Sequence, residues 1–181
     1  MLFKIGRSSV HRVLSAPVIL FIFFLHILDL TITPLITLGS ARVIFVYLFV
    51  VYAAFQWEGQ QATPAALMAG LLRDLSGSEI LGSETLALTA SAIFLDWFSQ
   101  KLDRRSAPVR AAAAFFFFAS TLSLVLILSA FSSPENAQVP AKISILFQVS
   151  LANAALTAVF FPLLSQWFRD DRPLRQYELF R

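Results

Sequence analysis

Two groups of polar residues lie in otherwise apolar sequence at spacings that allow chemistry. The first group is His26 and Asp29, which are three residues apart and would share one face of a helix. Such a pair can relay protons, bind a ligand or bond to a neighbouring helix. Asp29 lies near the end of its apolar segment, so hydration of its carboxylate is a further interpretation. A charge at the middle of a bilayer costs ~2.5–3.5 kcal/mol on insertion scales, so each one requires a reason.

The second group surrounds a short polar turn. Ala66, Gly70 and Asp74 recur every four residues, which predicts a stripe of small side chains that ends in a carboxylate. Small residues let helices approach closely in lipid. Asp74 can cap the amides of the next helix or pair with Arg73. In either case it would help hold two short helices together as a polar hairpin. The alternative interpretations are a substrate or ion site and a contact with a partner. The residues predicted to serve helix packing or partner contact are Ala66, Gly70, Arg73, Asp74, Gly77, Gly82 and Glu84.

The sequence offers no catalytic or cofactor-binding constellation. It has no cysteine, and its two histidines, His11 and His26, have no spacing typical of a metal site. No glycine-rich phosphate loop and no nucleophile elbow are present. We therefore expect a protein that is not an enzyme and that has no metal or cofactor.

The elements that position these residues are predicted to be membrane-spanning helices. Hydrophobic residues make up 57% of the chain, charged residues only 14%, and the mean hydropathy is +0.73. The apolar blocks are continuous rather than alternating, which favours helices over a barrel. We predict an all-α polytopic membrane protein, a single integral domain over residues 1–181 that ends in a short cytoplasmic tail at 169–181. Its six spans are expected at about 13–35, 42–58, 63–81, 83–100, 108–131 and 140–168.

The third span is the uncertain element of this topology. Its continuous helix ends near Leu75, and twelve helical residues reach only ~18 Å, which is less than the bilayer core. The distribution of basic residues favours counting it as a crossing. With six crossings and the N-terminus inside, 11 of the 14 Lys and Arg residues face the cytoplasm, namely Lys4, Arg7, Arg12, Lys101, Arg104, Arg105, Arg110, Arg169, Arg172, Arg175 and Arg181. The same distribution predicts cytoplasmic N- and C-termini and explains the basic pI without nucleic acid.

The segment Arg42–Leu102 resembles the MreD family, the membrane subunit of the bacterial rod-shape machinery. The resemblance rests on the apolar stretch RVIFVYLFVVYAAFQWEGQ and on AALMAGLLRDLSGSEILGSETLALT, which follows it. Its most characteristic part is Gly70-Leu71-Leu72-x-Asp74-Leu75 followed by Gly82. Arg73 departs from the family pattern, which usually has an apolar or small residue at that position.

The resemblance implies a non-enzymatic scaffold of the inner membrane. Its main expected partner is MreC, with which it would help couple MreB filaments to peptidoglycan synthesis by RodA and a penicillin-binding transpeptidase. It also implies the fold of the substrate-binding S components of energy-coupling-factor importers. The alternative function is vitamin binding as such an S component, suggested by the polar residues Asp74, Glu84, Gln148 and Asn153. A third hypothesis, an enzyme acting on lipid, lacks the carboxylate cluster that it needs.

Overall fold

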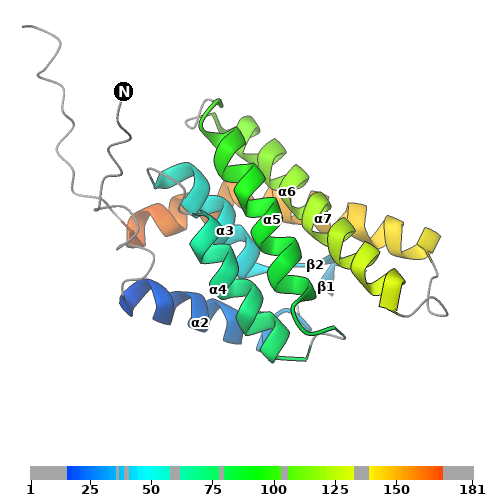
Figure 1. Cartoon of the computed structure of the whole chain (residues 1–181). Coiled ribbons are helices and arrows are strands. Elements are labelled where there is room, and N and C mark those ends of the chain that lie inside the picture. Colours follow the sequence, from blue (N-terminus) through cyan, green and yellow to red (C-terminus); the bar gives the residue numbers. More distant parts are fainter. Residues whose placement is uncertain are drawn as a thin grey trace, which may run out of the picture.

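The chain folds as a bundle of helices around one central helix (Figure 1). The computed structural model describes residues 16–35, 37–38, 41–57, 62–77, 80–102, 106–132 and 139–168. In these ranges there are six helices: α2 Ala16–Thr31, α3 Phe45–Gln56, α4 Ala62–Leu75, α5 Ser83–Ser99, α6 Ala107–Ser132 and α7 Val139–Trp167. The all-helical prediction is therefore confirmed. The predicted tail 169–181 and the start of the first span lie outside the described residues.

A small hairpin between α2 and α3 was not anticipated from the sequence. Strand β1, Thr37–Leu38, pairs antiparallel with β2, Ala41–Arg42. The Thr33 hydroxyl, in the turn after α2, donates a 2.8 Å hydrogen bond to the carbonyl of Val43. The side-chain amide of Asn153 on α7 donates to the carbonyl of Arg42 at 2.8 Å. These bonds attach the β1–β2 hairpin to the bundle and fix the position of the Arg42 backbone, from which its side chain extends.

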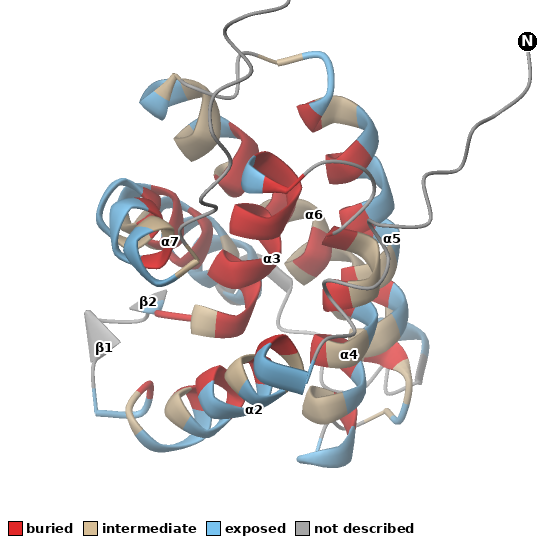
Figure 2. Ribbon diagram, turned by 90° about the vertical axis from the view of Figure 1, so that its left-hand side faces the viewer, coloured by how far each residue is buried: buried red, intermediate tan, exposed pale blue. Residues whose placement is uncertain are grey.

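Helix α3 forms the core of the bundle. Every residue from Val46 to Phe55 is buried, and Figure 2 shows this helix enclosed by the others. A helix that is apolar on all sides must be covered on all sides, which explains its central place. Phe49 in the first half of α3 and Trp57 just after its end both contact Phe168 beyond α7, with ring centroids 5.8 and 5.9 Å away. Trp57 is consequently buried, whereas Trp97 and Trp167 are exposed.

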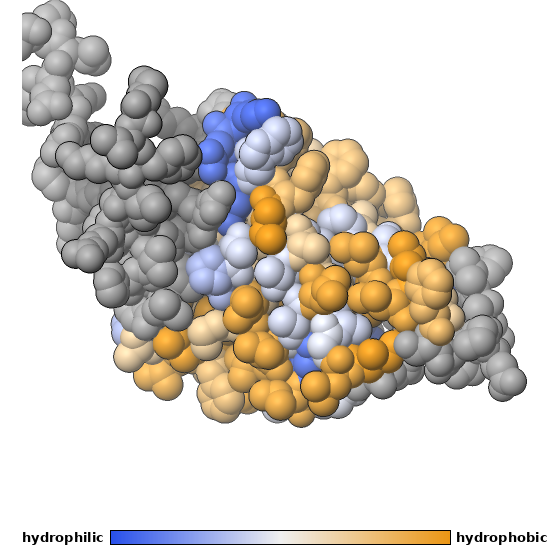
Figure 3. Space-filling model, viewed as in Figure 1, coloured by the Kyte–Doolittle hydropathy of each residue, from blue (hydrophilic) through white to orange (hydrophobic). Residues whose placement is uncertain are grey.

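The outer surface is strongly apolar. Figure 3 shows hydrophobic side chains over much of one face, with hydrophilic ones gathered where α5 ends and α6 begins. Leu86, Phe94, Phe116 and Phe131 are between 58% and 84% exposed. Monomeric soluble proteins rarely expose so much contiguous apolar area, so this surface suits lipid. Within the described residues, two helices are long and apolar enough to cross a membrane, Ala107–Phe131 and Lys142–Trp167; Ala16–Thr31 and Phe45–Gln56 are apolar but shorter. The six crossings therefore stay a prediction.

Contacts between helix ends show that α3, α4 and α5 run in alternating directions. The N-terminal end of α4 meets the C-terminal end of α5, where the Thr63 hydroxyl donates to Asp96 at 2.8 Å. The C-terminal end of α3 lies at the same place, because the Ser99 hydroxyl bonds to the Ala54 carbonyl at 3.2 Å. At the opposite end, the amide of Thr85 near the start of α5 bonds to Asp74 near the end of α4. This alternation is the arrangement that successive membrane passes require.

Candidate functional site

The predicted polar hairpin is formed by α4 and α5, and Asp74 joins its two helices. Its carboxylate accepts the backbone N–H groups of Glu84 at 3.1 Å and Thr85 at 3.0 Å, and the Thr85 hydroxyl also donates to it. The residue before α5, Gly82, has no side chain that could cap the helix itself. Asp74 therefore supplies a cap from the neighbouring helix and places a negative charge at the positive end of α5. Of the two structural alternatives for Asp74, the structure contains the cap.

The small residues of the stripe bring α4 against α5. Ala66 is fully buried, and a Cβ placed on Gly70 would lie 2.4 Å from the Cα of Thr85. Only a residue without a side chain allows this backbone approach. Both positions thus face the interior of the hairpin, and a partner cannot reach them without displacing α5.

The two glycines of the turn have backbone conformations that other residues seldom adopt. Gly77 has φ of +109° and Gly82 has φ of +93°, and both lie in the left-handed region. No other described residue has a positive φ. Gly77 lies two residues after α4 and Gly82 is the N-cap of α5, so the pair contributes to the reversal of the chain that brings Asp74 to the amides it caps.

Arg73 and Glu84 form an ion pair across the same hairpin. The Arg73 Nε and Nη2 atoms donate to the Glu84 carboxylate at 3.0 and 3.3 Å. The hydroxyl of Tyr47, in the buried helix α3, donates to the same carboxylate. The Arg73 guanidinium also lies over the Tyr47 ring, 5.1 Å from its centroid, within the range of a cation–π interaction. The charged residue that departs from the family pattern is thus anchored to the core.

His26 and Asp29 share a face of α2, but they have different partners. Asp29 is 8% exposed and accepts the N–H groups of Phe45 at 2.7 Å and Val46 at 3.2 Å, which caps α3. Hydration therefore does not explain it. His26 Nε2 bonds to the Ser76 hydroxyl at 2.6 Å, while its buried Nδ1 has no partner among the described residues.

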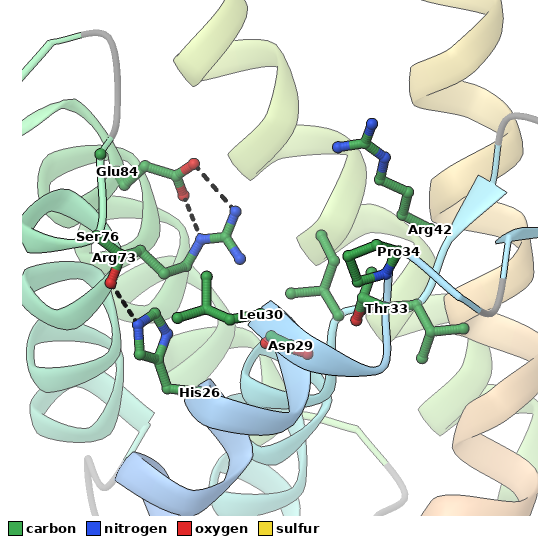
Figure 4. A pocket seen from close by; sticks show the side chains of 12 residues that line it. His26, Asp29, Leu30, Thr33, Pro34, Arg42, Arg73, Ser76 and Glu84 are labelled. Carbon is green, nitrogen blue, oxygen red and sulfur yellow. Dashed lines mark hydrogen bonds and ion pairs between the residues drawn. The ribbon is translucent and has the colours of Figure 1, made fainter.

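These side chains border a polar cavity of about 420 Å³ that lies between α2, the β1–β2 hairpin and the α4–α5 turn. Figure 4 shows the guanidinium groups of Arg42 and Arg73 facing one another across it, with His26 and Asp29 on α2. The volume lies within the ~300–1,000 Å³ typical of small-molecule sites. Its polar lining consists of His26, Asp29, Thr33, Arg42, Arg73, Ser76 and Glu84.

Three of the four polar residues suggested for vitamin binding do not line this cavity. Asp74 caps α5, and Gln148 is exposed on α7. Asn153 is buried and structural, since its side-chain oxygen accepts the N–H of Ile44 at 3.0 Å. Only Glu84 of that group borders the cavity.

Sequence reasoning missed several residues that matter to the site. Asp96 lies one turn before the basic seam that begins at Lys101, yet it is 1% exposed and caps α4. The available signal was its place one turn before the end of α5, because in a folded-back α4–α5 hairpin that end lies beside the start of α4 at Ala62 and Thr63. Tyr47 and Arg42 gave no signal of their own, because their roles depend on contacts far apart in the sequence.

The described residues define a class of protein. They form an apolar helical bundle with a lipid-compatible surface, carboxylates engaged at helix ends, and no group of three His, Asp or Glu side chains placed to hold a metal. This is a helical membrane protein whose conspicuous polar residues hold the fold together.

The profile of the family described as rod shape-determining protein MreD matches residues 11–170. The chain therefore belongs to the MreD family, as the resemblance in Arg42–Leu102 indicated, and it is a rod shape-determining membrane protein. No curated protein and no solved structure matches it significantly.

Proposed function

We propose that this chain is a non-enzymatic scaffold of the elongation complex in the inner membrane, where it binds MreC. Through MreC it helps couple MreB to RodA and a penicillin-binding transpeptidase. The observation that carries this proposal is the family match over residues 11–170. It is supported by the local chemistry, because the carboxylates of Asp29, Asp74 and Asp96 are engaged in capping helices.

The face of the α4–α5 hairpin opposite the core is the surface we propose for the membrane-spanning helix of MreC. A shallow groove runs along it, with Thr85, Thr89 and Ala90 among its smaller lining residues. Large apolar side chains border the groove, namely Leu67, Leu71, Leu86 and Ile93. A helix that packs in lipid needs such small residues for close approach and large ones at the flanks.

Co-purification from native membranes tests the scaffold and its docking face separately. Tagged wild-type chain is expected to retain MreC. Ala90→Trp fills the groove and is expected to lose most of the bound MreC, whereas Ala112→Trp, at an exposed position on α6, is the matched control and should retain it. Absence of MreC from the wild-type sample would overturn the scaffold proposal. Equal retention by both variants would overturn the docking face alone.

We further infer a fold like that of the S components of energy-coupling-factor importers. Support comes from the helical bundle, which has six helices within the described residues, and from the polar cavity at one end of it, because the family resemblance implies this architecture. Vitamin binding is the alternative function, and the cavity is the only observation that favours it. A vitamin that binds should raise the unfolding temperature by the amount that RT ln(1 + [L]/Kd) contributes. An unfolding temperature that stays unchanged with every vitamin of a panel, each at saturating concentration, favours the scaffold.

A further inference from the structure

Three basic residues are not accounted for by the predicted topology. Eleven of the 14 Lys and Arg residues flank the ends expected in the cytoplasm, and the remainder are Arg42, Arg73 and Lys142. The positive-inside rule disfavours cations on the far side of the membrane, so their presence needs another reason. In the folded chain all three border one or both of two adjacent pockets that share Arg42 and Arg73, although they come from β2, α4 and α7.

The two pockets are the polar cavity and, next to it, a groove between α6 and α7. The groove has a volume of about 560 Å³ and shares Arg42, Ile44 and Arg73 with the polar cavity. Lys142 borders the groove, and most of the remaining lining is apolar: Leu122, Val125 and Leu126 on α6, and Ile145, Leu146 and Val149 on α7. The walls belong to the two helices that are long and apolar enough to span a membrane. An apolar chain in the bilayer can therefore enter the groove from the side.

The charges at the junction of cavity and groove are unbalanced. Glu84 is paired with Arg73, and Asp29 is engaged with the amides at the start of α3. Arg42 and Lys142 are exposed and form no ion pair with a described residue. Two cations are thus available to a ligand, and the Arg73 guanidinium lies beside them. Phosphate oxygens are the groups that Arg recognises through paired N–H donors.

His26 adds a requirement for a hydrogen-bond donor on the ligand. The Ser76 hydroxyl donates to the carbonyl of Leu72 at 2.7 Å, so Nε2 of His26 carries the proton in the bond to Ser76. In the neutral ring Nδ1 is then an acceptor, and it is buried without a partner among the described residues. Because this atom has almost no accessible surface, a hydroxyl on the ligand's head group satisfies it when the ring turns toward the cavity that His26 lines.

From this arrangement we propose that the chain binds one molecule of an anionic phospholipid. The phosphate lies among Arg42, Arg73 and Lys142, a head-group hydroxyl reaches toward His26, and an acyl chain occupies the groove between α6 and α7. Such a lipid matches all three features of the space: its cations, its unpaired acceptor and its apolar walls. This proposal is independent of MreC binding, so either can fail without the other.

Native mass spectrometry of the full chain, purified in neutral detergent, tests the proposal with phosphatidylglycerol, phosphatidylcholine and inorganic phosphate. One phosphatidylglycerol is expected to bind in preference to phosphatidylcholine. The variant Arg42→Gln/Lys142→Gln should weaken this binding about 25-fold, or about fivefold for each cation, which corresponds to ~1 kcal/mol per cation near an anionic lipid. Lys101→Gln, in which the altered lysine lies over Trp97 outside this space, is the matched control and should bind as wild type does.

A second variant tests the acyl chain independently of charge. Val125→Trp fills the groove and should weaken binding of phosphatidylglycerol while Arg42 and Lys142 remain. Each variant's unfolding temperature is compared with that of wild type, and Arg42 and Lys142 are exposed, so their replacement should leave it unchanged. Equal binding of both lipids, unchanged binding by the double variant, or displacement of the lipid by equimolar inorganic phosphate would each overturn the proposal.

Discussion

Asp74 and Asp96 cap each other's helices. Asp74, near the end of α4, accepts two N–H groups at the start of α5, and Asp96, near the end of α5, accepts the N–H groups of Ala62 and Thr63 at the start of α4, at 3.2 and 2.9 Å. Each carboxylate also accepts a threonine hydroxyl, from Thr85 and Thr63 respectively. The hairpin is therefore closed at both ends by the same chemistry, and its two helices cannot be capped separately.

The reciprocal caps predict matched losses of stability. Asp74→Ala and Asp96→Ala should each lower the free energy of unfolding by about 2 kcal/mol, since each leaves two amides of a partly buried helix start without an acceptor. Asp74→Asn and Asp96→Asn keep one acceptor oxygen and should lose less. The measurement is unfolding in detergent by SDS titration, followed by circular dichroism. An Asp74→Ala variant as stable as wild type would show that the cap contributes nothing.

The Asp74→Ala variant also separates membrane insertion of the chain from its assembly with MreC. The spans should still insert into the membrane, because their hydropathy is unchanged, whereas recovery of MreC should fall as the α4–α5 face loosens. Membrane fractionation followed by co-purification measures both quantities on one sample. Recovery of MreC equal to that of wild type would remove Asp74 from the assembly argument.

Gly70 should tolerate no side chain. In Gly70→Ala the new Cβ would lie 2.4 Å from the Cα of Thr85, and backbone atoms cannot move aside as a flexible side chain can. We expect a loss of about 1–3 kcal/mol from overpacking. The control is Ala112→Val, which adds carbon at an exposed position of α6 and should be neutral. The comparison uses the same SDS titration, and equal stability of the two variants would contradict the close approach of α4 and α5.

The sequence predicted the helices and the hairpin better than the cavity. Continuous hydropathy located the six helices of the described residues, and four-residue spacing placed Gly70 and Asp74 on the face that meets α5. These signals are local, because helical periodicity fixes which residues share a face. The cavity depends on the packing of β2, α4 and α7, so Arg42 and Lys142 could be recognised as a pair only in the folded chain.

Asp29 and Asp96 show a second reason why the sequence predicted helices better than contacts between them. Both are isolated carboxylates near a helix end, where a side chain can reach water, as the sequence suggested for Asp29. In the structure each one bonds to the exposed amides of another helix. A sequence shows which helix starts lack a cap of their own, but the helix that supplies the missing cap is set by tertiary packing.

The Arg73–Glu84 pair should behave as one unit. Arg73→Met leaves the Glu84 carboxylate, whose side chain is 15% exposed, without its cation, and should cost about 1–3 kcal/mol, less than the ~3–5 kcal/mol of a fully buried pair. Glu84→Gln removes the opposite charge but keeps an acceptor for Tyr47. The double variant should be more stable than the sum of the two single losses predicts, by at least about 1 kcal/mol.

A double-mutant cycle between two remote positions provides the control for the coupling between Arg73 and Glu84. Lys101→Met combined with Glu84→Gln should be additive to within about 0.5 kcal/mol, because Lys101 contacts Trp97 rather than the α4–α5 turn. Additivity in both cycles would mean that the Arg73–Glu84 ion pair does not contribute to stability.

The alternating directions of α3, α4 and α5 predict the sides on which their connections can be labelled. The chain has no cysteine, so single cysteines can be introduced at exposed positions without altering a native one. Gln56→Cys and Gln100→Cys lie at the end where α3 and α5 finish, and Leu81→Cys lies between α4 and α5. In intact spheroplasts a membrane-impermeant maleimide should label Leu81→Cys alone. The other two should react only after permeabilisation, because the basic seam that follows Gln100 is expected inside. Labelling of Leu81→Cys from the same side as Gln56→Cys, with Gln100→Cys labelled from the opposite side, would mean that α4 re-enters without crossing, and the even number of passes would be wrong.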